Sequence, residues 1–379
     1  MADRESEVLA RIAPGVAALD AAQWDALTDG GDPFLSHGFL AALEDSGSVG
    51  PCSGWSPSPI YVDEEGTVVA AAPAYLKSHS QGEYVFDHGW AEAFQRAGGA
   101  YYPKLQIAVP FTPVPGPRLL GSRPQHLLAA CEAVVVQNGL SSAHITFLAE
   151  AEAAQSEARG WLIRDGLQYH WFNRGYADFD DFLGTLSSRK RKQIRKERAA
   201  AQAGLAFETL RGTEIAAAEW DSMWAFYQDT GARKWGQPYL TRAFFDCIAG
   251  TMSDKLLLFL AKRDGVPIAG ALNVVGGHAL FGRYWGALEE APFLHFELCY
   301  YQAIDWAIRH GLAEVQAGAQ GEHKLARGYE PVITRSAHFL ADPGLRAAVK
   351  RYLDGERAAV ADEARWLAEA LPYRSSDSA

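Results

Sequence analysis

The sequence has 379 residues, of which 48% are hydrophobic and 12% aromatic, and its formal net charge is −11. This length is enough for two domains that each bury a core, and no apolar run approaches the ~18 residues that cross a bilayer. The acidic balance disfavours general binding of DNA or RNA, because one short basic segment is a poor substitute for a continuous basic stripe.

The N-terminus, the cysteines and the histidines further restrict the class of protein, because they bear on its location, its disulfides and its metal sites. The stretch MADRESEV is too charged for a signal peptide, so we expect a cytoplasmic protein. The four cysteines form no CxxC pair, which favours free thiols over disulfides. No HExxH motif or paired metal-ligand spacing occurs among the eleven histidines, so the sequence predicts no metal site.

The order of strands and helices is similar in the two halves of the chain. In the first half, strands are predicted at 60–62, 68–76 and 143–148, and helices at 91–97 and 124–138. In the second half, strands are predicted at 255–263, 266–275, 279–286 and 313–317, and a helix at 292–310. A last amphipathic helix covers 343–371. These patterns predict an α/β (α+β) fold with domains at 1–175 and 176–340, followed by a packing helix and tail at 341–379.

The stretch SSRKRKQIRKER, residues 187–198, carries seven basic side chains and one acidic one in an otherwise acidic chain. As a helix it spreads its cations around the whole circumference, so its start cannot be buried. Each cation near a helix N-terminus destabilises the helix by about 0.3–1 kcal/mol, because the backbone dipole is positive there. A bound anion would offset this repulsion. The segment is either a solvated face or a site for a phosphate or lipid headgroup, and we favour the anion site. Its ligands would be Arg189, Arg191, Arg195 and Lys196.

Glu297 falls on the apolar side of the predicted helix 292–310. A helical wheel places it, opposite His295, in an arc formed by Phe293, Tyr300, Tyr301, Ile304 and Ile308. A carboxyl group among such neighbours holds its proton more tightly than in water, as a general base near neutral pH requires. Glu297 is therefore a candidate catalytic base. The alternative is a buried carboxylate that only hydrogen-bonds a backbone or tyrosine hydroxyl group.

A polar loop follows the predicted strand 313–317. It reads GEHKLARGY over 321–329 and would lie at the carboxyl end of a strand, where α/β sheets gather their chemistry. His323 could move a proton, while Lys324 and Arg327 could hold a phosphate or an oxyanion. The alternative is an ordinary polar connection.

Two further segments combine aromatic residues with cations. The segment 101–118, with Tyr102 and Lys104, is too apolar for a free loop and too rich in proline for a central strand, so we expect it to line a cleft. The segment 230–239, with Arg233 and Trp235, joins two predicted helices. Both segments suit an apolar substrate chain better than a sugar. The alternative is that they are ordinary packed surface.

With these motifs together, the sequence resembles a bacterial family of N-acyltransferases that is labelled for peptidoglycan biosynthesis or recognition. That family belongs to the acyl-CoA N-acyltransferase (GNAT) superfamily, beside the Fem aminoacyl transferases. The resemblance runs from Ser36 to Leu340 and rests on SSRKRKQIRKER, TGARKWGQPYL, HFELCYYQAIDWAIRHGL and AGAQGEHKLARGYEPV. It implies two fused GNAT-like domains, each a mixed, largely antiparallel twisted sheet flanked by helices.

The resemblance also implies an activity, because some members resemble bacterial ceramide synthases. The protein would then transfer an acyl group from a thioester, with long-chain acyl-CoA as co-substrate and no permanently bound cofactor, to a primary amine such as a sphingoid base. Glu297, with His323, would deprotonate the amine. The binding residues would be Arg189, Arg191, Arg195, Lys196, Lys104, Tyr102, Arg233, Trp235, Tyr301 and Lys324. A lipid acceptor would bring the protein into peripheral contact with the inner membrane.

The sequence departs from the superfamily at one motif, so donors other than acyl-CoA are alternatives. The superfamily binds pyrophosphate with a loop of the pattern R/Q-x-x-G-x-G/A, which opens the helix that follows the second set of strands. At that place the sequence reads GALEEAPF from Gly286, which lacks the pattern. The donor could instead be bound to an acyl carrier protein, or be an aminoacyl-tRNA as in Fem proteins. One alternative is therefore a Fem-type transferase that acts on a peptidoglycan precursor. Another is a non-catalytic lipid- or cell-wall-binding module that keeps only the scaffold.

Overall fold

The computed structural model describes residues 9–234, 238–318 and 321–374. The chain forms two compact units, one of Met1–Gly166 with Thr334–Val360 and one of Leu167–Ile333 with Ala361–Ala379. It passes from one unit to the other inside strands β9 (Leu162–Phe172) and β15 (Glu330–Leu340) and inside helix α12 (Pro343–Glu369). Regular elements therefore join the units, whereas the sequence predicts boundaries near 175 and 340.

The first unit contains a small sheet of order β1-β3-β4-β7 and a larger set of strands of order β15-β8-β6-β5-β2. The strands are β1 (Ala10–Ile12), β2 (Trp55–Pro57), β3 (Ile60–Glu64), β4 (Thr67–Ala72), β5 (Ala74–Lys77), β6 (Lys104–Ile107), β7 (Leu120–Gly121) and β8 (Ser142–Leu148). The helices are α1 (Ala21–Asp25), α2 (His37–Asp45), α3 (His88–Arg96), α4 (Pro124–Gln137) and α5 (Glu150–Ala158).

Two expectations for this unit need correction. The segment 101–118 is not a loop throughout, because Lys104–Ile107 form β6, which pairs with β5 and with β8. Its prolines lie outside the strand, so β6 keeps its backbone donors. The predicted strand 68–76 is two strands in different sheets, because Pro73 lacks the N–H that would continue the ladder.

The second unit contains strands in the order β10-β11-β12-β13-β14-β9. The strands are β10 (Ala206–Arg211), β11 (Leu256–Arg263), β12 (Val266–Val275), β13 (Ala279–Ala287) and β14 (Glu314–Gln316). The helices are α6 (Phe179–Thr185), α7 (Ser188–Gln202), α8 (Ala217–Lys234), α9 (Arg242–Thr251), α10 (Leu294–Phe296) and α11 (Gln302–Arg309), with a π-turn at Glu297–Tyr301 between the last two. The predicted antiparallel strands are present, and Asp264 and Gly265, both with positive φ, form the two-residue turn between β11 and β12.

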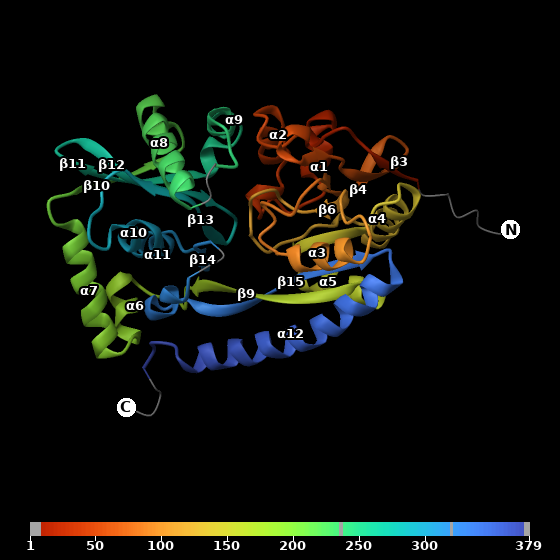
Figure 1. The fold of residues 1–379 in the computed structure, drawn as a ribbon. Coiled ribbons are helices and arrows are strands. Elements are labelled where there is room, and N and C mark those ends of the chain that lie inside the picture. Colours follow the sequence, from red (N-terminus) through yellow and green to blue (C-terminus); the bar gives the residue numbers. More distant parts are fainter. Residues whose placement is uncertain (1–8, 235–237, 319–320, 375–379) are drawn as a thin grey trace. The chain divides into compact units, whose positions relative to one another are not determined.

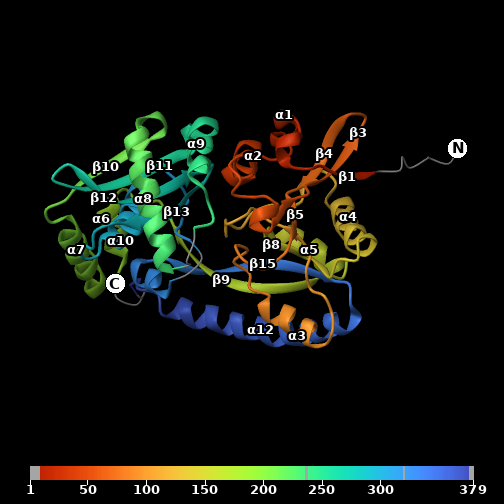
Figure 2. The same cartoon turned by 45° about the horizontal axis from the view of Figure 1, so that its top comes forward.

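Helices cover both faces of the β11–β13 strands, as Figures 1 and 2 show. Helix α8 packs so closely on one face that a Cβ at Gly286 would lie 2.0 Å from the carbonyl oxygen of Phe226. Leu298, Tyr300 and Ile304, from the π-turn and α11, join the buried core on the other face. Within the described ranges, no helix is both long enough and apolar enough to span a membrane. The arrangement confirms the predicted α/β (α+β) class.

Candidate active site

A wedge opens between two neighbouring strands of the second unit. Strands β13 and β14 are parallel and pair only over Ala279–Phe281 and Glu314–Gln316. Where they separate, a cavity of about 100 Å³ lies between them. It is lined by Ala271, Leu272, Asn273, Gly282, Arg283, Tyr284, Trp285, His295, Cys299, Tyr300, Ala317 and Gly318. We call this the wedge cavity.

The π-turn determines which side chains of the helix reach the wedge cavity. In an α-helix residues four apart share a face, whereas a π-turn brings residues five apart onto one face. Tyr300, five residues after His295, therefore lines the cavity together with it, and Cys299, four residues after His295, lines the cavity as well. The sequence analysis placed His295 on the side away from the chemistry, because a regular helical wheel contains no π-turn.

Tyr300 connects the wedge cavity with solvent. Its hydroxyl group and Nε2 of His323 are 2.8 Å apart and share a hydrogen bond. Tyr300 is buried, whereas His323 is exposed. Burial raises the pKa of Tyr300 above its usual value, so the phenol keeps its proton and can donate it. The pair can carry a proton between the cavity and water.

Asn273 places a hydrogen-bond acceptor in the wall of the wedge cavity. Its side chain is 1% exposed, and its Nδ2 donates to the carbonyl oxygen of Ala271 at 3.1 Å. Its Oδ1 has no hydrogen-bond partner within the described chain. A β-bulge between Leu272 and Asn273 lies at this point, as is common where a strand aims a side chain at a site. The oxygen can accept an N–H group from a ligand.

Lys324 lies behind the wall of the wedge cavity. Its side chain is fully buried, and Nζ donates a 2.6 Å hydrogen bond to the carbonyl oxygen of Gly318, a residue of the wall. Burial lowers the pKa of Lys324 to about 7. The predicted role of Lys324 in direct binding therefore changes: in this conformation it positions the backbone after β14.

A larger hollow of about 660 Å³ adjoins the wedge cavity, since Trp285 and His295 line both. Glu289 and Glu290 also line this hollow. They occupy the stretch where the superfamily's pyrophosphate loop is missing. Glu289 is paired with Arg263, but the carboxylate of Glu290 repels phosphate groups, so this hollow suits an amine better than the pyrophosphate of coenzyme A.

The surroundings of Glu297 differ from the predicted ones. It is fully buried, but its carboxylate receives two hydrogen bonds from Arg198 of α7, at 3.0 and 3.1 Å, and one from Gln202 at 2.9 Å. It lines none of the three cavities described for this unit. The sequence pattern shows the apolar arc of its own helix but not the partners that α7 supplies. The observed contacts describe a carboxylate that holds α7 in place.

The basic segment forms α7 as predicted, and its cations fall into two groups. Arg195 pairs with Asp180 at 2.7 Å, and Arg198 pairs with Glu297. Both arginines line an open hollow of about 620 Å³, which also contains Asp178, Asp180 and Asp305. Arg189, Arg191 and Lys196 form no ion pair within the described chain, and Arg189 and Lys196 are exposed.

The remaining predicted residues lie apart from the wedge cavity. Tyr301 is buried and donates to Glu197, and it accepts from Nε of Arg327 at 2.9 Å. Lys104 and Tyr102 belong to the first unit, where Lys104 is fully buried among carboxylates. Trp235 and the side chain of Arg233 lie outside the described residues. Asn273, His295, Cys299 and Tyr300 were not predicted as site residues, although the last three lie in the motif HFELCYYQAIDWAIRHGL.

The comparisons with known proteins agree with this architecture. The FemAB-like family, described as peptidoglycan biosynthesis/recognition, matches residues 15–375, so the chain belongs to that family and is a transferase by class. The structure of FemX is 13% identical, with a TM-score of 0.55, covering 88% of this chain and 98% of FemX. A conserved protein of unknown function from Bacteroides thetaiotaomicron VPI-5482 is 11% identical, with a TM-score of 0.50, covering 87% of this chain and 99% of that one.

At these identities the structures show the fold alone. A tandem GNAT protein from the clavulanic acid biosynthesis pathway is a weaker match, 13% identical with a TM-score of 0.45, covering 89% of this chain and 99% of that protein. No curated protein matches the sequence. The predicted family is thus confirmed, while the resemblance to ceramide synthases gains no support.

Proposed function

We propose that this protein is a Fem-type transferase that moves a small aminoacyl group from an aminoacyl-tRNA to a primary amine of a peptidoglycan precursor. The size and lining of the wedge cavity carry this proposal. A cavity of about 100 Å³ favours a short side chain over a long fatty chain. The alternative in which acyl-CoA supplies a long acyl group fits this cavity less well.

The lining of the cavity favours an aminoacyl group over a plain acyl group. The unpaired Oδ1 of Asn273 can accept the N–H of an α-amino group, which a fatty acyl group lacks. Leaving a buried acceptor unpaired costs roughly 1–3 kcal/mol, so a ligand that satisfies it gains affinity. Glu290, in the adjoining hollow, favours an approaching ammonium group over a pyrophosphate, whereas Glu289 is already paired with Arg263.

The reaction is a direct aminolysis of the ester. The acceptor nitrogen attacks the carbonyl carbon, a C–N bond forms, and the bond to the 3′ oxygen of the tRNA breaks. His295, which lines both the cavity and the hollow, accepts the proton that the nitrogen loses. Tyr300 donates a proton to the leaving oxygen and regains one through His323, which is exposed.

The cations of α7 that have no ion-pair partner within the described chain would bind phosphate groups of the donor or of the precursor. Arg189, Arg191 and Lys196 lack ion-pair partners in the described chain, so they are available for this role. Arg195 and Arg198 contribute less because Asp180 and Glu297 already neutralise them.

The proposal is tested by incubating the purified protein with tRNA charged with radiolabelled glycine, alanine or serine and with a UDP-linked peptidoglycan precursor. We expect label to enter the precursor, and the rate to fall in Tyr300→Phe. Tyr352→Phe, a change at an exposed tyrosine, is the matched control. Absence of transfer from all three charged tRNAs would contradict the proposal, whereas transfer from palmitoyl-CoA to sphinganine would support the acyl-CoA alternative.

A further inference from the structure

The larger sheet of the first unit has one polar face that is buried. Alternate residues of β5, β6 and β8, such as Leu76, Leu105 and Ala143, point to an apolar core. The residues between them form the polar face, which comprises Tyr75, Lys77, Lys104, Gln106, Ser142, His144, Thr146, Ser336 and His338. Each of these side chains is at most 3% exposed. A sheet face this polar is unusual beneath other protein, because buried polar groups cost free energy unless they are fully paired.

A single loop, residues 78–87, covers the part of this face that carries the two lysines; we call it the cover loop. Ser78, Gln81 and Phe86 are exposed, whereas Gly82, Glu83 and Asp87 are buried, so the loop is one layer thick. Gly82 lies against the ring of Phe111, where a Cβ would be 2.7 Å from the nearest ring atom. Backbone hydrogen bonds to the rest of the unit occur at Ser78 and Gly82.

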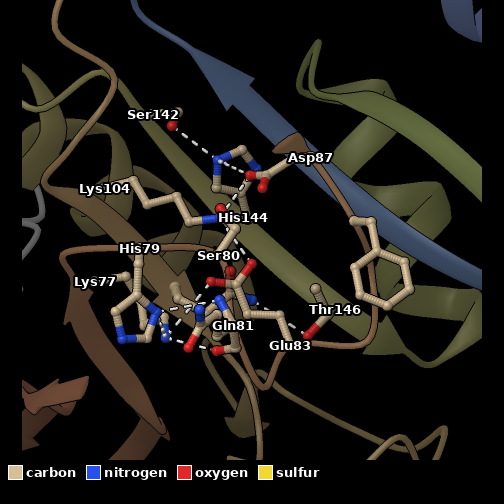
Figure 3. A network of polar contacts seen from close by, with 12 residues as sticks. Lys77, His79, Ser80, Gln81, Glu83, Asp87, Lys104, Ser142, His144 and Thr146 are labelled. Carbon is tan, nitrogen blue, oxygen red and sulfur yellow. Dashed lines mark hydrogen bonds and ion pairs between the residues drawn. The ribbon is translucent and has the colours of Figure 1, made fainter. Parts of the chain in front are cut away.

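Ionic contacts hold the cover loop on the polar face (Figure 3). Nζ of Lys104 donates to Glu83 at 2.7 Å, to Asp87 at 2.5 Å and to Ser80 at 2.9 Å. Nζ of Lys77 donates to the carbonyl oxygen of Gln81 at 2.9 Å and is 3.8 Å from Glu83. The two carboxylates of the loop thus cover the two ammonium groups of the sheet.

A chain of hydrogen bonds fixes the protonation states deeper in the face. The hydroxyl group of Tyr101 donates to Asp87 at 2.7 Å, while Nδ1 of His144 and Nδ1 of His338 are 2.7 Å apart. One of these two nitrogens must be unprotonated for them to bond, and burial lowers the pKa of His144 to about 3. His144 is therefore neutral. Burial lowers the pKa of Lys77 to about 7, whereas for Lys104 the neighbouring Glu83 and Asp87 outweigh burial and raise the pKa, so Lys104 carries most of the positive charge of this face.

The closed loop leaves this polar layer incompletely paired. Oε1 of Glu83 and Oδ1 of Asp87 lack hydrogen-bond partners within the described residues, as do Oε1 of Gln106 and the hydroxyl group of Tyr75 on the sheet. Partly satisfied polar networks are less stable than an apolar layer of the same shape. The arrangement is therefore poorly explained as a stabilising core, and it leaves acceptors and donors for another occupant.

We propose that the cover loop is a lid over an anion-binding site of the first unit. In the closed state Glu83 and Asp87 occupy the positions that carboxylate or phosphate groups of a ligand take on Lys77 and Lys104 when the loop opens. Gln106 and Tyr75 form the polar floor of the site. The site consists wholly of residues of the first unit, so it is independent of the transfer chemistry proposed for the second.

Hydrogen exchange with mass spectrometry, on the full-length protein, tests the lid. Glu83→Gln removes the charge that contacts both Lys77 and Lys104, with little change in side-chain size. It should speed exchange of amides 79–86 at least ~10-fold, as expected for a loop with a low opening free energy. Glu92→Gln, an exposed position of α3, is the matched control and should leave exchange unchanged. Unchanged exchange in Glu83→Gln would overturn the proposal.

Binding of anions tests the site. Calorimetry with citrate and with inorganic phosphate, each against sodium chloride at equal ionic strength, should show binding to Glu83→Gln at least ~10-fold tighter than to the wild type. The anion that binds more tightly distinguishes carboxylate from phosphate ligands. Binding should be lost when Lys77→Met or Lys104→Met is added to Glu83→Gln, with circular dichroism to confirm folding. If neither anion binds folded Glu83→Gln with a Kd below ~10 mM, no such site exists.

Discussion

Arg198 and Glu297 form a two-point ion pair between the middle of α7 and the start of the π-turn. The contact joins the basic segment to the helix that lines the wedge cavity. It gives Glu297 a structural role in the described conformation. Under the proposed function, the proton transfers fall to His295 and Tyr300, which line the cavity.

The substitution Glu297→Gln tests this role. Removing the charge from one partner of a buried pair leaves the other uncompensated, so the free energy of unfolding should fall by about 2–3 kcal/mol. Urea denaturation measures this loss, with the exposed Glu363→Gln as control. A protein of unchanged stability that turns over more than ~100-fold more slowly would instead restore Glu297 as the base.

His323 should act as a proton relay between Tyr300 and solvent. His323→Ala should lower kcat about 10-fold or more with little change in KM, because the residue does not line the wedge cavity. Since His323 is exposed, added imidazole should restore part of the rate. His278→Ala, at another exposed histidine, should have the wild-type kcat. A wild-type kcat in His323→Ala would remove the relay from the mechanism.

Lys324 should make stability depend on pH. Its pKa falls from 10.5 to about 7 on folding, so between these values the unfolded chain binds the additional proton. Stability must therefore rise with pH across this window, by up to about 1.4 kcal/mol per pH unit for one proton, and the gain is lost as the pH falls through 7. Lys324→Met should reduce the slope of the urea midpoint between pH 7 and 10. Part of the slope should persist, because burial lowers the pKa of Lys77 in the same direction.

The contact of α8 with β13 should depend on a glycine. In Gly286→Ala the new Cβ would lie 2.0 Å from a backbone oxygen of α8, which cannot move without shifting the helix. We expect the free energy of unfolding to fall by about 3 kcal/mol or more. Gly355→Ala in α12 meets no atom within 4 Å and should stabilise the protein by about 0.5–1 kcal/mol. If the two substitutions changed the free energy of unfolding equally, the close packing of α8 on β13 would be contradicted.

The sequence predicts the strands of the second unit well, because their signals are local. Leu256–Arg263 is a continuous apolar run, and the Asp264-Gly265 turn follows it directly. Strand β6 was missed because nearby prolines suggested a loop, although none of them lies within the strand.

The site was harder to predict because it depends on contacts between distant segments. The π-turn shifts His295, Cys299 and Tyr300 relative to a regular helix, and no residue pattern predicts such a turn. The partner of Glu297 is Arg198, 99 residues earlier in the chain. His323 was singled out from its loop, but its hydrogen-bond partner Tyr300 was assigned to the apolar arc of its helix.

The central claim is that the wedge cavity accepts a small aminoacyl group. The most direct measurement is a competition in which the protein, a UDP-linked peptidoglycan precursor and sphinganine are incubated with alanyl-tRNA and palmitoyl-CoA at equal concentrations. The intact masses of both acceptors are then determined. The account predicts that the precursor gains the mass of one alanyl residue and that sphinganine is unchanged. A palmitoyl group on either acceptor, with no alanyl product, would contradict it.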